Sequence, residues 1–126
     1  MKRILVIDDD AQLRKMLRQM LERQGYGVIE AGDGKEGMAL YRQAPTELII
    51  TDIIMPEKEG VETIIELRRD FPDVKIIAIS GGSRSLNKEY YLELAKRLGA
   101  AYTFTKPFAR KELLEAIEDL LTAGVY

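Results

Sequence analysis

Four aspartates in this chain stand where short apolar segments end. Asp8, Asp9 and Asp10 follow the run ILVI (4–7), and Asp52 closes the segment ELIITD (47–52). Acidic groups that converge repel one another, and this repulsion raises carboxylate pKa values. A divalent cation removes that penalty. Because the chain contains no histidine and no cysteine, its oxygen ligands favour Mg²⁺ or Mn²⁺ over zinc.

A hydroxyl and an ammonium group stand at two further segment ends. Ser80 closes VKIIAIS (74–80), and Lys106 follows AYTFT (101–105). This set of acids, one hydroxyl and one lysine lacks a base and is poorly suited to hydrolysis. A carboxylate can, however, attack phosphorus and form an acyl phosphate. A cation and the lysine would neutralise the transferred group, and the hydroxyl would hydrogen-bond it. The pattern indicates a phosphoryl acceptor centred on Asp52.

Each of these residues also has a simpler structural interpretation. Asp10 is well placed to cap the helix that follows it. Asp8 and Asp9 could be solvated acids. Ser80 alone is more often a turn hydroxyl, and Lys106 alone is more often a surface charge. The combination is far more specific than any one of its members.

Five short apolar segments alternate with five amphipathic ones, which predicts a strand followed by a helix five times over. The predicted strands are 4–7, 26–31, 47–52, 74–80 and 101–105. Residues at helical spacing follow each strand: Leu13, Met16, Leu17, Met20 and Leu21; the segment from GDGKEG (32–37) to about Gln43; Val61, Ile64, Ile65 and Arg68; Tyr91, Leu94, Ala95 and Leu98; and Leu113, Leu114, Ile117, Leu120 and Leu121. This order is typical of an α/β fold with a parallel sheet covered on both faces, whose sites form beyond the carboxyl ends of the strands. We expect one domain over residues 1–126.

Composition narrows the function classes. The chain has 126 residues, 46% of them hydrophobic, and a net charge of −2 with both signs interspersed. No basic field suits nucleic acid, and the lack of cysteine excludes disulfides and thiol chemistry. The start MKRILVIDDD is not a signal peptide, because its apolar run ends in three acids. We expect a soluble, cytoplasmic protein.

Together, the motifs VIDDD (6–10), TDIIMPEKEG (51–60), AIS (78–80) and TKPF (105–108) resemble the receiver domain of two-component response regulators. The resemblance covers essentially the whole chain. It implies a flavodoxin-like (βα)5 fold, a doubly wound five-stranded parallel sheet in the order 2-1-3-4-5. The switch point of that order lies between the first and third strands, which is where Asp8, Asp9 and Asp52 fall.

The resemblance also implies roles for individual residues. Asp52 matches the phosphoacceptor and a metal ligand. Asp9 is expected to bind Mg²⁺ (or Mn²⁺) directly and Asp8 largely through water, while the backbone carbonyl of Ile54 matches a further protein ligand.

Two other motifs complete the implied site. Ser80 matches the hydroxyl that turns toward the phosphoryl group, and Lys106 matches the lysine that pairs with it. The Lys106–Pro107 bond is expected to be cis, as in the family. The resemblance implies a signalling phosphoacceptor rather than an enzyme, catalysing only its own phosphorylation and dephosphorylation.

The chain cannot phosphorylate itself through histidine, because it has none. The phosphodonor is therefore expected to be a histidine kinase or histidine phosphotransfer protein, or a small donor such as acetyl phosphate. Phosphorylation would shift an existing equilibrium between an inactive and an active state. The output partner or domain is expected to contact the fourth helix, fifth strand and fifth helix, where the candidate residues are Tyr90, Tyr91, Lys96, Tyr102 and Arg110. No nucleic acid or membrane contact is expected.

The sequence departs from the family pattern at Thr103 and in the stretch from Ser80 to Gly99. Thr103 stands where the family often has Tyr or Phe, and strand alternation points the flanking Tyr102 and Phe104 to the opposite face. This argues against a coupled movement of Ser80 and an aromatic ring. The stretch from Ser80 to Gly99 is longer than the common pattern, so GGSRSLN (81–87) is expected to form a longer loop.

The sequence leaves two other function classes open besides the phosphoacceptor, a dinucleotide-binding enzyme and an interaction module. Gly32, Gly34 and Gly37 spell G-x-G-x-x-G, the dinucleotide-binding fingerprint, although after the second strand rather than the first. Asp33 and Glu36 would repel a pyrophosphate there, and Asp33 is better understood as a helix cap. The third class is an interaction module that works without phosphorylation. Such modules usually lose the acceptor, an acidic residue or the lysine, and all of these are present.

Ile54 generates a prediction about the lifetime of the phosphoryl group. An apolar side chain two residues after Asp52 hinders an attacking water, so the phosphorylated state should outlast that of the variant Ile54→Asn. Dephosphorylation rates of the parent and of this variant measure the effect. An unchanged dephosphorylation rate in the variant would contradict this prediction.

Overall fold

The computed structural model describes residues 1–53, 60–80 and 88–122, and of residues 88, 89, 91 and 92 only the backbone. The predictions for the carbonyl of Ile54, for the loop at 81–87 and for the side chain of Tyr91 lie outside the described residues.

The alternation of strands and helices is as predicted, with ends that differ by one to a few residues. The strands are β1 (Arg3–Ile7), β2 (Gly27–Ala31), β3 (Leu48–Asp52), β4 (Ile76–Ser80) and β5 (Tyr102–Thr105). The helices are α1 (Ala11–Arg23), α2 (Gly34–Gln43), α3 (Gly60–Asp70), α4 (Lys88–Arg97) and α5 (Arg110–Thr122). No helix among these residues combines the length and apolar character needed to cross a membrane.

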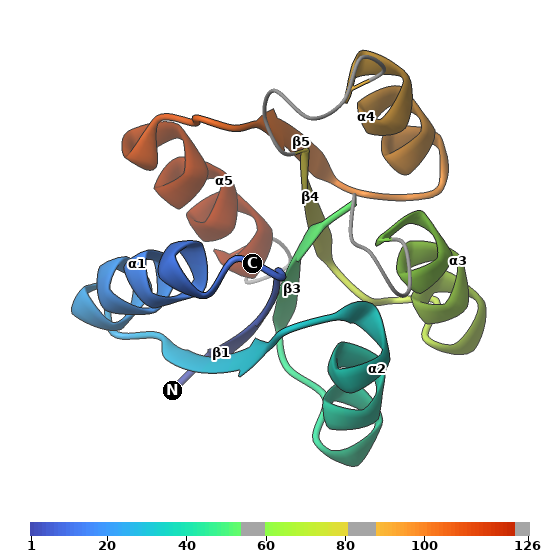
Figure 1. The fold of residues 1–126 in the computed structure, drawn as a ribbon. Helices are drawn as coiled ribbons and strands as arrows, with labels where there is room; N and C mark the ends of the chain where they lie inside the picture. The colour runs from blue at the N-terminus through green and yellow to red at the C-terminus, as the bar shows by residue number, and fades with distance from the viewer. Residues whose placement is uncertain (54–59, 81–87, 123–126) are drawn as a thin grey trace.

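All strand pairs are parallel, and the sheet order is β2-β1-β3-β4-β5, as the resemblance implied. The chain moves outward from β1 to β2 and then returns across β1 to form β3, so β1 and β3 are neighbours at the switch point (Figure 1). Ile7 is paired with Thr51 in this register. The residues that follow, Asp8 and Asp52, therefore leave adjacent strands at the same edge of the sheet.

Helices cover both faces of the sheet, and each strand divides its side chains between two cores. Leu5, Ile7 and Ile49 pack with residues of α2, α3 and α4. Ile4 and Ile50, one position away, pack instead with residues of α1 and α5. Figure 1 shows the two groups of helices on opposite sides of the sheet. Burial on both faces explains why the strands are continuous apolar runs rather than alternating ones.

Capping residues set the ends of the first helices. The carboxylate of Asp10 accepts hydrogen bonds from the main-chain N–H groups of Gln12 and Leu13, as predicted. Beyond the end of α1, Gly25 has a φ of +91°, a conformation that favours glycine. Asp33 caps α2 by accepting from the N–H of Glu36, also as predicted. These caps fix where the chain leaves β1 and β2.

The third helix corrects one detail of the expected pattern. Ile65 is one of the residues whose spacing predicts this helix, but 45% of it is exposed. The buried stripe of α3 is formed by Val61, Ile64 and Leu67. Its neighbours on that side are Gly60 and Thr63, both small and also buried. The buried stripe therefore does not include Ile65, although this residue is next to Ile64 in sequence.

The start of α3 lies directly against the end of β3. A Cβ atom added to Gly60 would overlap the carbonyl oxygen of Asp52 and the Cα of Ile53, which are both main-chain atoms. In contrast, a Cβ added to Gly37 of α2 would overlap only the side-chain tip of Ile7. Gly60 therefore sets how closely α3 approaches the strand that carries Asp52.

This difference predicts unequal effects for two matched substitutions. Gly60→Ala should lower the free energy of unfolding by about 3 kcal/mol, because main chain must move to relieve the overlap. Gly37→Ala should cost about 1 kcal/mol, because a side chain can move and alanine favours the helix. Urea denaturation measures both. Equal losses would show that the contact of α3 with β3 is not a tight constraint.

Candidate functional site

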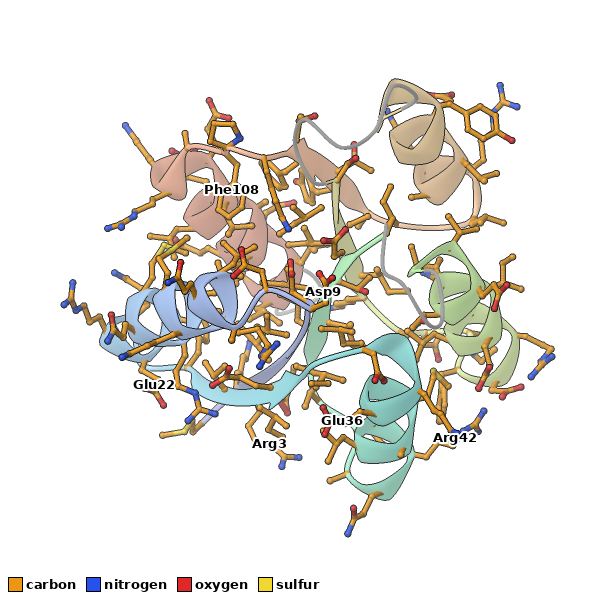
Figure 2. The ribbon with its side chains drawn as sticks, in the orientation of Figure 1. Arg3, Asp9, Glu22, Glu36, Arg42 and Phe108 are labelled. Atoms are coloured by element: carbon orange, nitrogen blue, oxygen red, sulfur yellow. The ribbon has the colours of Figure 1, made fainter. Side chains whose placement is uncertain are left out.

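The predicted site residues meet at the carboxyl edge of the sheet. Asp8 follows β1, Asp52 is the last residue of β3, Ser80 is the last residue of β4, and Lys106 follows β5. The side chain of Asp9 is exposed, and Figure 2 shows it beside the end of β3. The strand order, rather than closeness in sequence, brings these residues together.

Lys106 holds the two buried carboxylates together. Its Nζ donates to Oδ2 of Asp8 at 2.9 Å and to Oδ2 of Asp52 at 2.9 Å. Asp8 is 2% and Asp52 is 3% exposed. The N–H of Lys106 donates to the carbonyl of Ser80 at 2.9 Å, which anchors the start of the lysine to β4. From this anchor the long side chain extends to β3 and β1.

Burial and charge together set the proton affinity of the cluster. Burial raises the pKa of Asp8 to about 6; hydrogen bonds from the N–H of Asp10 and from Lys106 oppose the rise, and the charge of Asp52 adds to it. Burial also acts to lower the pKa of Lys106, but hydrogen bonds to the two aspartates outweigh it, and the pKa lies above its ordinary value. Lys106 therefore stays positively charged in the site.

The acidic residues fit a divalent cation. Asp8, Asp9 and Asp52 each offer one carboxylate oxygen, and these atoms lie within 4.8 Å of one another. With Lys106, the three carboxylates leave two negative charges to be balanced, which is the charge of a divalent ion. Asp10 lies outside this set, because its carboxylate caps α1. Oxygen ligands alone suit Mg²⁺ or Mn²⁺.

Ser80 is fully buried, and its hydroxyl oxygen has no hydrogen-bond partner within the described part of the chain. A buried hydroxyl without a partner costs about 1–3 kcal/mol. Folded proteins rarely keep such groups without a reason. Ser80 is the last residue of β4 and its carbonyl accepts from the N–H of Lys106, so it lies at the same edge of the sheet as the acidic residues.

Thr103 and its neighbours follow the predicted alternation. Tyr102 and Phe104 pack against the core formed with α1 and α5. Thr103, between them, is paired in register with Ala78, which belongs to the core on the other face. The aromatic rings are therefore on the face of the sheet opposite to Thr103. The Lys106–Pro107 bond is cis, as predicted.

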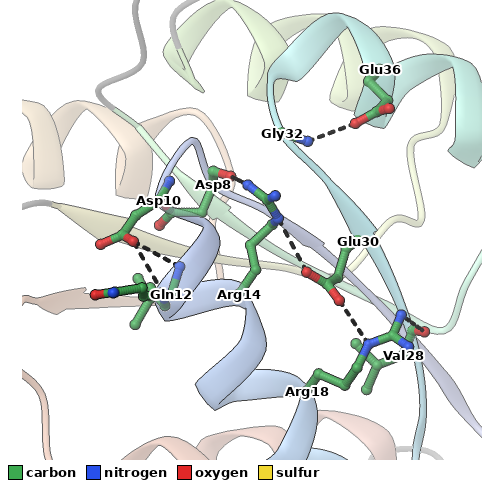
Figure 3. A network of polar contacts seen from close by, with 10 residues as sticks. Asp8, Asp10, Gln12, Arg14, Arg18, Val28, Glu30, Gly32 and Glu36 are labelled. Carbon is green, nitrogen blue, oxygen red and sulfur yellow. Dashed lines mark hydrogen bonds and ion pairs between the residues drawn. The ribbon is translucent and has the colours of Figure 1, made fainter.

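Sequence reasoning missed a polar network behind the acidic residues (Figure 3). Arg14 of α1 donates to the carbonyl oxygen of Asp8 at 2.6 Å and forms an ion pair with Glu30 of β2 at 3.1 Å. The amphipathic pattern of α1 indicates only that Arg14 is off the main apolar stripe. Its partner lies 16 residues away, and no local signal reveals the pairing.

The glycine-rich segment has a structural explanation. The N–H of Glu36 is taken by Asp33, and the Glu36 carboxylate accepts from the N–H of Gly32 at 2.6 Å. The chain's own carboxylates thus occupy the place where a pyrophosphate would bind. Gly37 packs against Ile7 of β1. Nothing in this arrangement favours dinucleotide binding.

The chain matches a known protein family over most of its length. The family profile of the response regulator receiver domain matches residues 4–118. Residues 4–118 include the four strand ends that carry the site and nearly all of the described strands and helices.

Individual relatives and solved structures agree with this match. The chain is 32% identical to the chemotaxis protein CheY of Halobacterium salinarum, over 97% of this chain and 98% of that protein. It is 35% identical to the transcriptional regulatory protein CpxR of Klebsiella pneumoniae, over 96% of this chain but only 50% of CpxR. A receiver domain structure from Clostridium thermocellum has a TM-score of 0.87 and 26% identity, covering 97% of this chain and 95% of that one.

The raised pKa of Asp8 predicts a pH-dependent cost in the metal-free protein. The folded state binds the Asp8 proton more tightly than the unfolded chain, so stability falls as the pH rises from about 4 to about 6. In EDTA at pH 7.5, Asp8→Asn should therefore be more stable than the parent by about 3 kcal/mol. The gain should almost vanish at pH 4. Urea denaturation at the two pH values measures it.

Asp33→Asn is the matched control, because it neutralises a carboxylate outside the cluster. A gain of equal size in both variants would contradict the assignment of the cost to the buried site. A destabilised Asp8→Asn variant at pH 7.5 would show that the bond to Lys106 outweighs burial.

Proposed function

The chain belongs to the response regulator receiver domain family, and on this premise we propose that Asp52 accepts a phosphoryl group that switches the binding of an output partner. The chain is thus the receiver domain of a two-component response regulator, a signalling protein rather than a classical enzyme. The observation that carries the proposal is the buried pair of Asp8 and Asp52 on one lysine, next to a buried hydroxyl.

In the proposed step, a carboxylate oxygen of Asp52 attacks the phosphorus of a phosphohistidine on a partner. The new O–P bond forms as the P–N bond breaks, and the electron pair stays on the imidazole nitrogen, which can take a proton from water. Asp52 needs no base, because it is a carboxylate when it attacks. The chain's contribution is to position this oxygen and to stabilise the charge that arrives with the phosphoryl group.

The surrounding groups supply that stabilisation. Lys106 already contacts Asp52 and can pair with a phosphoryl oxygen while its main chain stays bound to Ser80. The Ser80 hydroxyl would gain a partner by donating to another phosphoryl oxygen. Formation of the acyl phosphate would therefore satisfy a group that is unsatisfied before the transfer.

The acidic residues would hold a divalent cation beside the acceptor. Asp8, Asp9 and Asp52 are the carboxylate ligands that we propose, and the carbonyl of Ile54 is the further ligand that the family resemblance implies. A bound Mg²⁺ neutralises negative charge shared between the acceptor and the phosphoryl oxygens. Asp9, the exposed member, is the one most accessible to the ion, whereas Asp8 is held by Lys106 and by the N–H of Asp10.

The proposed phosphodonor is a histidine kinase or a histidine phosphotransfer protein, since the chain has no histidine of its own. Beside the site, a recess of about 350 Å³ lies between α1 and the start of α5, lined by Leu13, Met16 and Phe108 as well as Lys106. We propose that this recess, which Lys106 links to the site, receives the donor while its phosphohistidine reaches Asp52.

The output is proposed to lie on α4, β5 and α5. Tyr90 of α4 is 63% exposed. Tyr102 of β5 donates to Asp119 of α5 at 2.6 Å. The chain spans about half the length of transcriptional regulators such as CpxR and nearly all of CheY. We propose that residues 1–126 form one cytoplasmic receiver unit, whose output is either a separate protein or another part of a longer chain.

Chemical phosphorylation tests the proposal. With acetyl phosphate and Mg²⁺, the parent should gain the mass of one phosphoryl group in intact mass spectrometry, and EDTA should suppress the gain. Asp52→Asn should remain unmodified, because it lacks the attacking oxygen anion. Lys106→Met should be modified more slowly, because charge on the phosphoryl group is less stabilised.

Asp33→Asn is again the matched control and should be modified like the parent. A mass gain that persists in Asp52→Asn would refute the acceptor assignment. A parent that gains no mass, but still binds its output protein, would favour the interaction module that works without phosphorylation.

A further inference from the structure

The β1–α1 turn, which carries Asp8 and Asp9, is held from behind by a side chain of α1. Arg14 donates to the carbonyl oxygen of Asp8 at 2.6 Å and pairs with Oε1 of Glu30 at 3.1 Å. The side chain of Arg14 is 20% exposed and that of Glu30 is 28% exposed. Figure 3 shows Arg14 between the turn and β2. This placement is more sheltered than that of an ordinary surface ion pair.

The bond from Arg14 controls the orientation of both acidic residues. The carbonyl of Asp8 and the N–H of Asp9 belong to one planar peptide group. Holding the carbonyl therefore fixes the plane from which the Cα atoms of Asp8 and Asp9 both leave. The N–H of Asp8 is bound to the carbonyl of Ala31 at 3.1 Å, and the N–H of Asp10 to the Asp8 carboxylate at 2.8 Å. Arg14 adds the anchor on the remaining main-chain group of Asp8.

Glu30 makes this anchor compatible with cation binding. A lone guanidinium near Asp8 and Asp9 would repel a divalent ion and compete for their carboxylates. Paired with Glu30, Arg14 keeps its donors aimed at the carbonyl, and the Glu30 carboxylate offsets part of its positive charge. Outer contacts of this kind commonly change metal affinity by about 10-fold to 100-fold when they are removed.

Arg18 provides an internal comparison. It lies one turn further along α1, pairs with the other oxygen of Glu30 at 2.8 Å and donates to the carbonyl of Val28 at 3.0 Å. Removing Arg14 leaves Glu30 paired with Arg18, and removing Arg18 leaves it paired with Arg14. Both arginines thus pair with Glu30 and donate to a main-chain carbonyl, but the carbonyl is that of Asp8 for Arg14 and that of Val28 for Arg18, and the Arg18 side chain is more exposed, at 39% against 20%.

We propose that Arg14, oriented by Glu30, is a positioning residue that sets the geometry of Asp8 and Asp9 for a divalent cation. This inference rests on the metal site of the proposed function. It adds a role to two residues that contact neither the phosphoryl group nor the ion. The role concerns affinity for the ion and is independent of the transfer step.

Binding of Mn²⁺, followed by the electron paramagnetic resonance signal of the free ion, tests the inference without any phosphorylation. Arg14→Met should raise the Kd for Mn²⁺ by about 10-fold, while Arg18→Met should change it by less than about 2-fold. Arg14→Lys should fall between parent and Arg14→Met, because one ammonium cannot serve the carbonyl and Glu30 together. Glu30→Gln should also weaken binding, and Arg14→Met with Glu30→Gln should show less than the summed effect.

Urea denaturation in EDTA separates positioning from general stability. If Arg14→Met and Arg18→Met lose similar stability but only the first loses Mn²⁺ affinity, the inference stands. Parent-like binding by Arg14→Met, or equal loss by both variants, would overturn it and leave the proposed function intact. If Arg14→Met does not fold, the comparison of Arg14→Lys with Arg18→Met decides in the same way. Absence of Mn²⁺ binding by the parent itself would refute the metal site and, with it, this inference.

Discussion

The ammonium group of Lys106, held between the carboxylates of Asp8 and Asp52, is the interaction on which the site depends. Two acids that are almost fully buried can stay charged side by side only if a cation offsets them. Lys106 can do so because the sheet order places β5 two strands from β3, within reach of a long side chain. A buried arrangement of this kind costs stability, and the raised pKa of Asp8 expresses that cost. The fold tolerates it at one edge, where the remaining charge is available for a ligand.

The remaining polar contacts can be understood as ways of keeping this cluster in one geometry. Gly60 lets α3 approach the main chain of Asp52. Arg14 holds the carbonyl of Asp8, and Glu30 orients the Arg14 side chain. Both act from outside the cluster and leave its charge unchanged. In the proposed transfer, the charge is adjusted by the cation and the phosphoryl group, whereas the geometry is supplied by the fold beforehand.

Much of the fold was predictable because its determinants are local. The strands are buried on both faces and so read as short apolar runs, and caps such as Asp10 and Asp33 follow from side-chain chemistry close in sequence. The convergence of Asp8, Asp52 and Lys106 was also predictable, because parallel strands bring their carboxyl ends to a common edge. The sheet order itself came from the family resemblance.

Other features depend on contacts that a single sequence does not encode locally. The pairing of Arg14 with Glu30 joins a helix to a strand that is distant in sequence. In the sequence alone, each of the two residues is indistinguishable from a solvent-exposed charge. The exposure of Ile65 depends on how α3 is rotated against the sheet, which a helical pattern defines only to part of a turn. The closeness of Gly60 to β3 appears only when the two elements are packed.

Asp8, Asp9, Asp52 and Lys106 are expected to respond to a cation as one electrostatic unit. Carboxyl-carbon NMR of the protein labelled at aspartate, recorded as Mg²⁺ is added, tests it most directly. The carboxyl signals of Asp8, Asp9 and Asp52 should shift together along one saturable curve, while those of Asp10 and Asp33 should shift little. Saturable shifts centred on other carboxylates, or none at all at Asp52, would contradict it.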